Sequence, residues 1–196
     1  MPKIHWIAGG IIALVTASIL LFTFSGNKWE LRNVKGRVSD LHFSLIDDTG
    51  KHVNEGNYRG NILLLYFGFT GCPQQCSLTL ERLNHVLSQL GNDANYVQVL
   101  FVSINPANDT SPVLHNYLAR FHSSNITGLT GSESEIKQLA LRLHATHKPG
   151  SRDSGDLPHS SAVYIFNAAG KARLLATPED TDEKIVHDLR RMIHAS

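Results

Sequence analysis

The sequence contains few charged residues and few cysteines. Only 18% of its 196 residues are charged, and 18 Lys and Arg nearly balance 17 Asp and Glu. So small a net charge excludes a protein that binds nucleic acid through a broad basic surface. Two cysteines are too few for a disulfide-stapled scaffold, and a hydrophobic content of 42% is too high for a disordered chain. The composition is that of one ordinary globular domain.

One long uncharged run stands near the N-terminus. Residues 7–24 carry no charge and, as a helix rising roughly 1.5 Å per residue, would span about 27 Å, close to a bilayer core. We therefore expect residues 1–25 to form a transmembrane helix that anchors the protein. A cleaved signal peptide is the alternative, because Lys3 precedes the run, although no clear cleavage site follows it. Residues 26–37 are expected to be a linker, and residues 38–196 the folded domain.

The charges around this run do not favour a cytoplasmic N-terminus. Only Lys3 precedes the run, and four basic residues follow it, namely Lys28, Arg32, Lys35 and Arg37. The thiol chemistry considered below suits an oxidising space, however, and a large downstream domain can translocate despite its charges. We therefore expect the domain to lie outside the cytoplasm, on the periplasmic side of a bacterial inner membrane.

Strand and helix patterns alternate along the rest of the chain. Residues 41–53 predict a β-hairpin, and the apolar runs over residues 62–67 and 96–104 predict strands buried within a sheet. A second hairpin is expected over residues 161–177. Apolar residues at helical spacing predict four helices, over residues 80–90, 110–121, 132–143 and 181–193. This order is typical of an α/β thioredoxin-like fold with an N-terminal β-hairpin extension.

The two cysteines, Cys72 and Cys76, stand where the first buried strand gives way to a helix. Open α/β sheets place their sites at this end of their strands. A four-residue spacing at the start of a helix would put both sulfurs on one side, where the positive helix terminus favours thiolates. Two thiolates can bind a soft metal such as Cu(I), or can cycle between dithiol and disulfide. A stapling disulfide or two inert core cysteines are the structural alternatives.

Several motifs, in the same order, resemble the Sco/SenC family, whose members are copper chaperones and thiol oxidoreductases of cytochrome c oxidase assembly. YFGFTGCPQQCSLTLERLN at residues 66–84 is similar to the family's strand, CPxxC motif and helix. FVSINPANDT at residues 101–110 is similar to its second strand, and two later segments also match, ITGLTGSESEI and PHSSAVYIFNAAGK. The resemblance implies that copper binds to Cys72, Cys76 and His159, the histidine before the late hairpin. Two sulfurs and one nitrogen suit Cu(I).

The chain departs from the family pattern around these ligands. Pro158 stands where an acidic residue usually precedes the histidine, and Gly71 stands where a histidine often precedes the first cysteine. In the second-strand motif Asn105 and Asn108 replace the usual Asp and Arg. Pro158 also stands where thioredoxin-like enzymes carry a cis-proline against their cysteine pair. This last position favours thiol chemistry as well as copper binding.

The leading hypothesis is a membrane-anchored copper-binding chaperone for the dinuclear copper site of cytochrome c oxidase, or for another copper or thiol protein. The alternative is an enzyme, a thiol-disulfide oxidoreductase in which Cys72 attacks and Cys76 resolves the mixed disulfide. A peroxidase is disfavoured, because Thr70 lies two residues before Cys72 instead of three and has no obvious arginine partner. His144 and His147 could add an auxiliary copper contact beside the polar stretch of residues 144–158.

Overall fold

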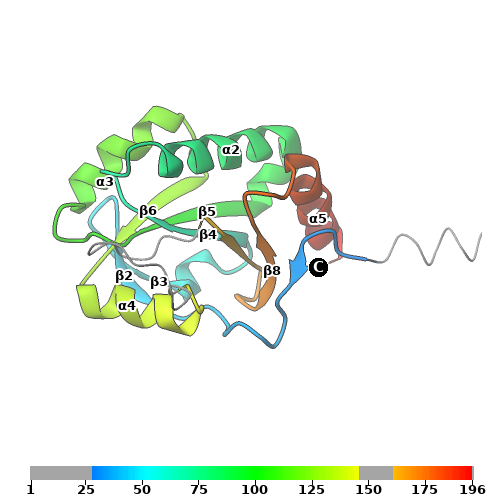
Figure 1. The fold of residues 1–196 in the computed structure, drawn as a ribbon, viewed down its shortest axis with the longest axis horizontal. Helices are drawn as coiled ribbons and strands as arrows, with labels where there is room; N and C mark the ends of the chain where they lie inside the picture. The colour runs from blue at the N-terminus through cyan, green and yellow to red at the C-terminus, as the bar shows by residue number, and fades with distance from the viewer. Residues whose placement is uncertain (1–27, 146–160, 196) are drawn as a thin grey trace, which may run out of the picture. The chain divides into compact units, whose positions relative to one another are not determined.

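The structure is a computed structural model that describes residues 28–145 and 161–195 (Figure 1). Within these residues eight strands form one mixed sheet in the order β1-β8-β7-β4-β5-β6-β2-β3. Strand β4 runs parallel to β5, and β5 runs parallel to β6, whereas all other neighbours are antiparallel. The strands are β1 (Arg32–Asn33), β2 (Ser44–Asp47), β3 (His52–Asn54), β4 (Ile62–Gly68), β5 (Val97–Ser103), β6 (Ile126–Thr130), β7 (Val163–Phe166) and β8 (Ala172–Ala176).

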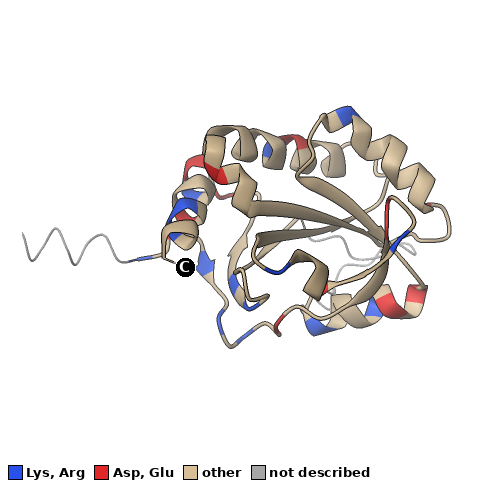
Figure 2. Cartoon of the chain, turned by 180° about the vertical axis from the view of Figure 1, so that it is seen from behind, with Lys and Arg blue, Asp and Glu red and all other residues tan. Residues whose placement is uncertain are grey.

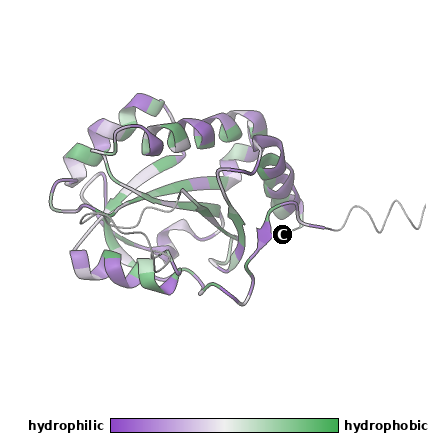
Figure 3. Cartoon of the chain, in the orientation of Figure 1, coloured by the Kyte–Doolittle hydropathy of each residue, from purple (hydrophilic) through white to green (hydrophobic). Residues whose placement is uncertain are grey.

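Helices cover both faces of this sheet. The α-helices are α2 (Gln75–Leu90), α3 (Ser111–Leu118), α4 (Glu133–Arg142) and α5 (Asp182–His194), and short 3-10 turns are η1 (Glu55–Tyr58), η2 (Gly91–Tyr96) and η3 (Ala119–Phe121). Helices α2, α3 and α5 pack against one face, and α4 covers the other (Figure 1). The central strands are apolar, while the outer faces of the helices are polar (Figure 3). Lys, Arg, Asp and Glu lie on helices, on loops and on the outer strands β1, β2 and β8, whereas β4, β5, β6 and β7 carry none (Figure 2).

The centre of the core is strand β4, in which all seven residues are buried. Because side chains alternate along a strand, Leu63, Leu65 and Phe67 face α4. Tyr66 and Gly68 face the opposite side, toward Phe101 and helix α2. The prediction of a central strand buried on both faces is therefore confirmed, and so is the α/β thioredoxin-like arrangement around it.

Residues that favour helix ends in the sequence also begin and end helices in the structure. Ser132 and Glu135 form the capping box that opens α4: the Ser132 hydroxyl accepts from the Glu135 N–H at 3.3 Å, and Glu135 accepts from the Ser132 N–H at 2.9 Å. Gly91 ends α2 with a φ of 62°, a left-handed value that glycine adopts without strain. Both predicted hairpins form, as the pairs β2–β3 and β7–β8.

Three features differ from the predictions. Strand β6 was not predicted, because its five residues ITGLT show neither alternation nor a long apolar run. Val113, one of the apolar residues at helical spacing that predict the helix of residues 110–121, is 40% exposed, since the register of α3 turns Leu114 and Leu118 toward the sheet. The folded unit also begins before Val38, at Leu31.

Residues 31–34 belong to the domain and not to a linker. Leu31 and Val34 are 3% and 5% exposed, and β1 between them pairs with β8. The Leu31 N–H donates to the buried carboxylate of Asp188 on α5 at 2.9 Å. A two-residue strand gives no periodic signal, so the sequence could not show it. The predicted anchor, residues 1–25, lies outside the described residues, and among those described no helix is long and apolar enough to span a bilayer.

Candidate thiol and metal centre

The two cysteines meet at the start of helix α2. Cys72 lies in the loop after β4, and Cys76 lies in the first turn of the helix. The Cys76 N–H donates to the Cys72 sulfur at 3.4 Å, and both thiols are free. The side chain of the N-cap residue, Gln74, makes no capping hydrogen bond to the first turn. The Cys72 sulfur therefore satisfies one of the N–H groups that a helix start leaves open.

The two sulfurs differ in burial. Cys72 is 9% exposed, whereas Cys76 is fully buried. Burial, together with the neighbouring Cys72, raises the pKa of the Cys76 thiol to about 11. The expectation that the helix terminus would favour a thiolate at both positions is therefore wrong for Cys76, because the loss of water outweighs the helix dipole. The pair has an outer sulfur and an inner, protonated one.

The inner sulfur occupies a space that strand β4 leaves open. A Cβ added at Gly68 would lie 2.9 Å from the Cys76 sulfur and 2.6 Å from Cε2 of Phe101. Two residues earlier on the same face, the Tyr66 hydroxyl donates to the Cys76 sulfur at 3.5 Å. Neither Tyr66 nor Gly68 was predicted to belong to the site. Their two-residue spacing before the cysteine loop was the available signal, because it places both on the face that meets α2.

A buried carboxylate holds the loop that leads to the cysteines. Asp109 is 1% exposed and accepts from the Thr70 N–H at 2.9 Å, the Thr70 hydroxyl at 2.5 Å and the Ser103 hydroxyl at 2.6 Å. This network ties the loop to the carboxyl end of β5. Asn105 and Asn108, the substituted positions of the second-strand motif, bond to each other at 3.1 Å. Thr70 is thus a structural partner of Asp109.

The comparisons with known proteins identify this arrangement. The family model SCO1/SenC matches residues 33–194, which is most of the chain and includes both cysteines. The chain belongs to the SCO1/SenC family. Its domain is the thioredoxin-like Sco fold, with the mixed eight-stranded sheet described above.

Solved members of the SCO1/SenC family share the fold. The copper-bound ScoI of Bradyrhizobium japonicum is 29% identical, with a TM-score of 0.67 over 79% of this chain and 99% of that one. The copper-bound Sco1 of yeast is 26% identical, with a TM-score of 0.70 over 81% of this chain and 90% of that one. An SCO2-like protein of Rickettsia felis is 36% identical over 133 residues, 66% of this chain and 64% of that protein. The match thus spans less than two thirds of this relative's length.

In this SCO1/SenC domain the structure describes only part of the predicted ligand set. Cys72 and Cys76 are brought together, whereas His159, Pro158 and His147 lie outside the described residues. His144 follows α4 with a φ of 54° and is exposed. No group of three or more His, Cys, Asp or Glu side chains that could hold a metal ion occurs within residues 28–145 and 161–195. The described centre is therefore a pair of soft sulfur donors.

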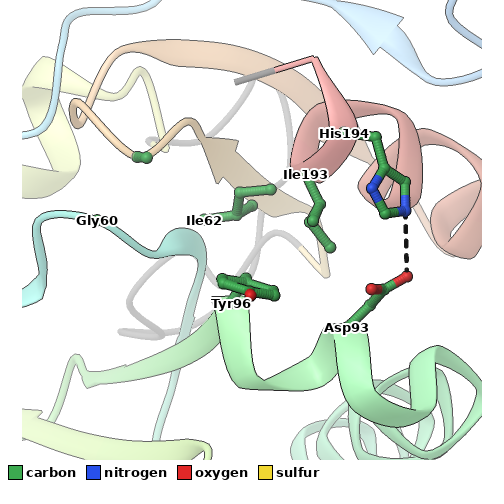
Figure 4. A pocket seen from close by; sticks show the side chains of 7 residues that line it. Gly60, Ile62, Asp93, Tyr96, Ile193 and His194 are labelled. Carbon is green, nitrogen blue, oxygen red and sulfur yellow. Dashed lines mark ion pairs between the residues drawn. The ribbon is translucent and has the colours of Figure 1, made fainter.

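A separate cavity of about 480 Å³ lies at the amino ends of β4 and β5 (Figure 4). At its rim His194 pairs with Asp93 at 3.5 Å. Its lining contains no cysteine and consists of Gly60, Ile62, Asp93, Tyr96, Ala168, Ile193 and His194. The cysteines leave the carboxyl end of β4, so this cavity is not part of the thiol centre.

Proposed function

We propose that this protein is a copper-binding chaperone that acts in cytochrome c oxidase assembly. The observation that carries the proposal is the pair of free thiols at the start of α2, joined by the 3.4 Å contact between the Cys76 N–H and the Cys72 sulfur. Copper-bound ScoI and Sco1 support it, because they share this fold. Copper would be the cargo, bound by Cys72, Cys76 and His159 and passed to a dinuclear copper site.

The sulfur pair fits a soft ion. Thiolate is a preferred ligand of Cu(I), and at the helix start the Cys76 N–H donates to the Cys72 sulfur at 3.4 Å. Binding must displace the proton of the Cys76 thiol, whose pKa is about 11, so copper binding releases a proton at neutral pH. Cys72 is the more exposed of the two cysteines, so an incoming ligand of a partner would reach its sulfur first. Transfer would then proceed by ligand exchange, with the partner's donor replacing Cys72 first.

A copper titration tests this proposal. The reduced full-length chain in detergent should bind one copper per chain, and its Cu(II) form should show thiolate-to-copper charge-transfer absorption. Cys72→Ser, Cys76→Ser and His159→Ala should each weaken binding and alter that absorption. His52→Ala is the matched control, since His52 is an exposed histidine on the edge strand β3. Binding weaker than about 1 μM in the unaltered chain would refute the proposal.

A thiol-disulfide oxidoreductase is the second candidate, and the difference in burial of the two sulfurs favours it. The Cys72 thiolate would attack one sulfur of a partner disulfide, which forms a mixed disulfide and releases one partner thiolate. The Cys76 sulfur, once deprotonated, would then attack Cys72, which closes the Cys72–Cys76 disulfide and releases the second partner thiolate. Two electrons pass from the pair to the partner.

Reduction of a disulfide substrate separates the two candidates. An oxidoreductase retains its rate in His159→Ala and loses it in Cys72→Ser. A copper chaperone without this activity shows no turnover in any variant. Cys76→Ser should trap the mixed disulfide on Cys72, because the resolving sulfur is gone.

We also propose that residues 1–25 anchor the protein, with its domain on the periplasmic side of a bacterial inner membrane. The uncharged run of residues 7–24 supports this placement. Fractionation of cells that express the full chain tests it. An anchored chain stays in the membrane pellet after alkaline washing and is digested when protease is added to spheroplasts. Release into the periplasm of a shorter chain that lacks the uncharged run would instead indicate a cleaved signal peptide.

A further inference from the structure

The buried hydroxyl of Tyr66 makes one hydrogen bond that the proposed chemistry has not used. Tyr66 is fully buried in the central strand β4, and its hydroxyl donates to the Cys76 sulfur at 3.5 Å. A buried tyrosine hydroxyl needs a partner, because it has lost the water that would otherwise satisfy it. Here the partner is one of the two reactive sulfurs.

Packing against neighbouring residues holds both partners of the contact between the Tyr66 hydroxyl and the Cys76 sulfur. Gly68, on the same face of β4, leaves the space that the Cys76 sulfur fills, and a Cβ there would lie 2.9 Å from that sulfur. The Tyr66 ring packs against Phe101, with ring centroids 5.9 Å apart. Both Tyr66 and Cys76 are fully buried. The hydroxyl is therefore fixed on the sulfur by packing, in addition to the hydrogen bond itself.

We propose that Tyr66 is a positioning residue of the thiol centre, which holds the Cys76 sulfur through its hydroxyl and stabilises the reduced, electron-rich sulfur over the disulfide. A thiol or thiolate sulfur accepts a hydrogen bond better than a disulfide sulfur, because it carries more negative charge. The same bond withdraws charge from a thiolate bound to copper, a tuning that hydrogen bonds around cysteine ligands exert in copper sites. The copper part of this inference rests on the proposed function, whereas the thiol part does not.

Tyr117 provides a matched control within the same aromatic cluster. Its ring stacks on the other side of Phe101, with centroids 5.8 Å apart and an interplanar angle of 18°. Its hydroxyl is buried and makes no hydrogen bond to either cysteine sulfur. Tyr117→Phe therefore removes a buried hydroxyl near the centre without removing a bond to sulfur. Any effect shared by the two variants reports on the cluster, and any difference reports on the sulfur contact.

The test compares Tyr66→Phe with Tyr117→Phe in the full-length chain, first without metal. The dithiol–disulfide equilibrium of each protein is measured in glutathione or dithiothreitol buffers. Tyr66→Phe should shift this equilibrium about fivefold toward the disulfide, the factor for one hydrogen bond of ordinary net strength. Tyr117→Phe should leave it unchanged. Both variants keep the aromatic ring, and thermal unfolding checks that both remain folded.

The second measurement is the charge-transfer absorption of the Cu(II)-loaded proteins. Loss of the Tyr66 hydroxyl should move the band to longer wavelength, since the sulfur becomes a stronger electron donor, and Tyr117→Phe should not move it. If Tyr66→Phe and Tyr117→Phe have the same dithiol–disulfide equilibrium and the same charge-transfer band, Tyr66 does not position the Cys76 sulfur. If the unaltered chain binds no copper, the proposed function fails, while the metal-free equilibrium still decides the role of Tyr66.

Discussion

Replacement of Gly68 by alanine is the sharpest test of how the thiol centre is packed. The new Cβ would lie 2.6 Å from Cε2 of Phe101 and 2.9 Å from the Cys76 sulfur, closer than real Cβ contacts allow. Overpacking of this kind costs about 1–3 kcal/mol. Alanine also restricts the unfolded chain, which stabilises by about 0.4–1 kcal/mol. The clash is the larger effect, so Gly68→Ala should destabilise the domain by about 1–2 kcal/mol.

Gly71→Ala is the matched control, three residues further along the chain in the loop that follows β4. Its Cβ would meet only the Phe69 ring, at 3.6 Å, which is ordinary van der Waals contact. This variant should be neutral or more stable by about 0.5 kcal/mol. Urea unfolding of both variants measures the difference, and copper affinity should fall in Gly68→Ala alone, because the sulfur is displaced. Equal stability of Gly68→Ala and the unaltered chain would show that the inner sulfur is not confined as described.

Three further outcomes follow from the described contacts. Asp109→Ala should lower the free energy of unfolding by about 3 kcal/mol and Asp109→Asn by about half of that, because the carboxylate loses its hydrogen bonds from Thr70 and from the buried Ser103 hydroxyl. A loss below about 1 kcal/mol in urea unfolding of Asp109→Ala would contradict the network. Iodoacetamide at pH 8 should alkylate Cys72 well before Cys76, whose pKa is raised from near 9 to about 11. Between pH 9 and about pH 11 the folded chain keeps the Cys76 proton that the unfolded chain releases, so the free energy of unfolding should fall as the pH rises through this window. Mass mapping of the alkylated cysteines checks the order of alkylation. Alkaline unfolding curves, with Cys76→Ser as the control, check the loss of stability. Ser132→Ala should cost about 1 kcal/mol through loss of the α4 cap, whereas Thr181→Ala, at a helix start without a side-chain capping bond, should cost less than half as much by thermal unfolding.

Local patterns were sufficient for most of the fold. The apolar run of β4, the helical spacing of α2 and the capping box of Ser132 each determine their own element, because hydrophobic period and capping chemistry act over a few residues. Strand β6 and the two-residue β1 were missed for the same reason. Strand β1 is too short to show a period, and β6 shows neither alternation nor a long apolar run. Each exists because a neighbouring strand provides its hydrogen bonds.

Part of the candidate site could likewise be predicted from local sequence patterns, and part could not. The sequence placed Cys72 and Cys76 at the end of a strand and the start of a helix, and the structure confirms that position. It could not show that Cys76 is the inner sulfur, since burial depends on Gly68 and Phe101 from two different strands. The helix dipole therefore gave the wrong direction for the pKa of Cys76. His159 stays a prediction from the family motif.

By itself the sequence determined most of the elements, the strand that ends at the cysteines and the family that the motifs resemble, because all of these depend on residues close together in the chain. Only the tertiary structure decided that Tyr66 bonds to the Cys76 sulfur and that Asp109 holds the cysteine loop from 39 positions away. Contacts of this kind depend on which face of each element is packed inward. That choice is made by the whole core, through burial and the need to satisfy every buried polar group.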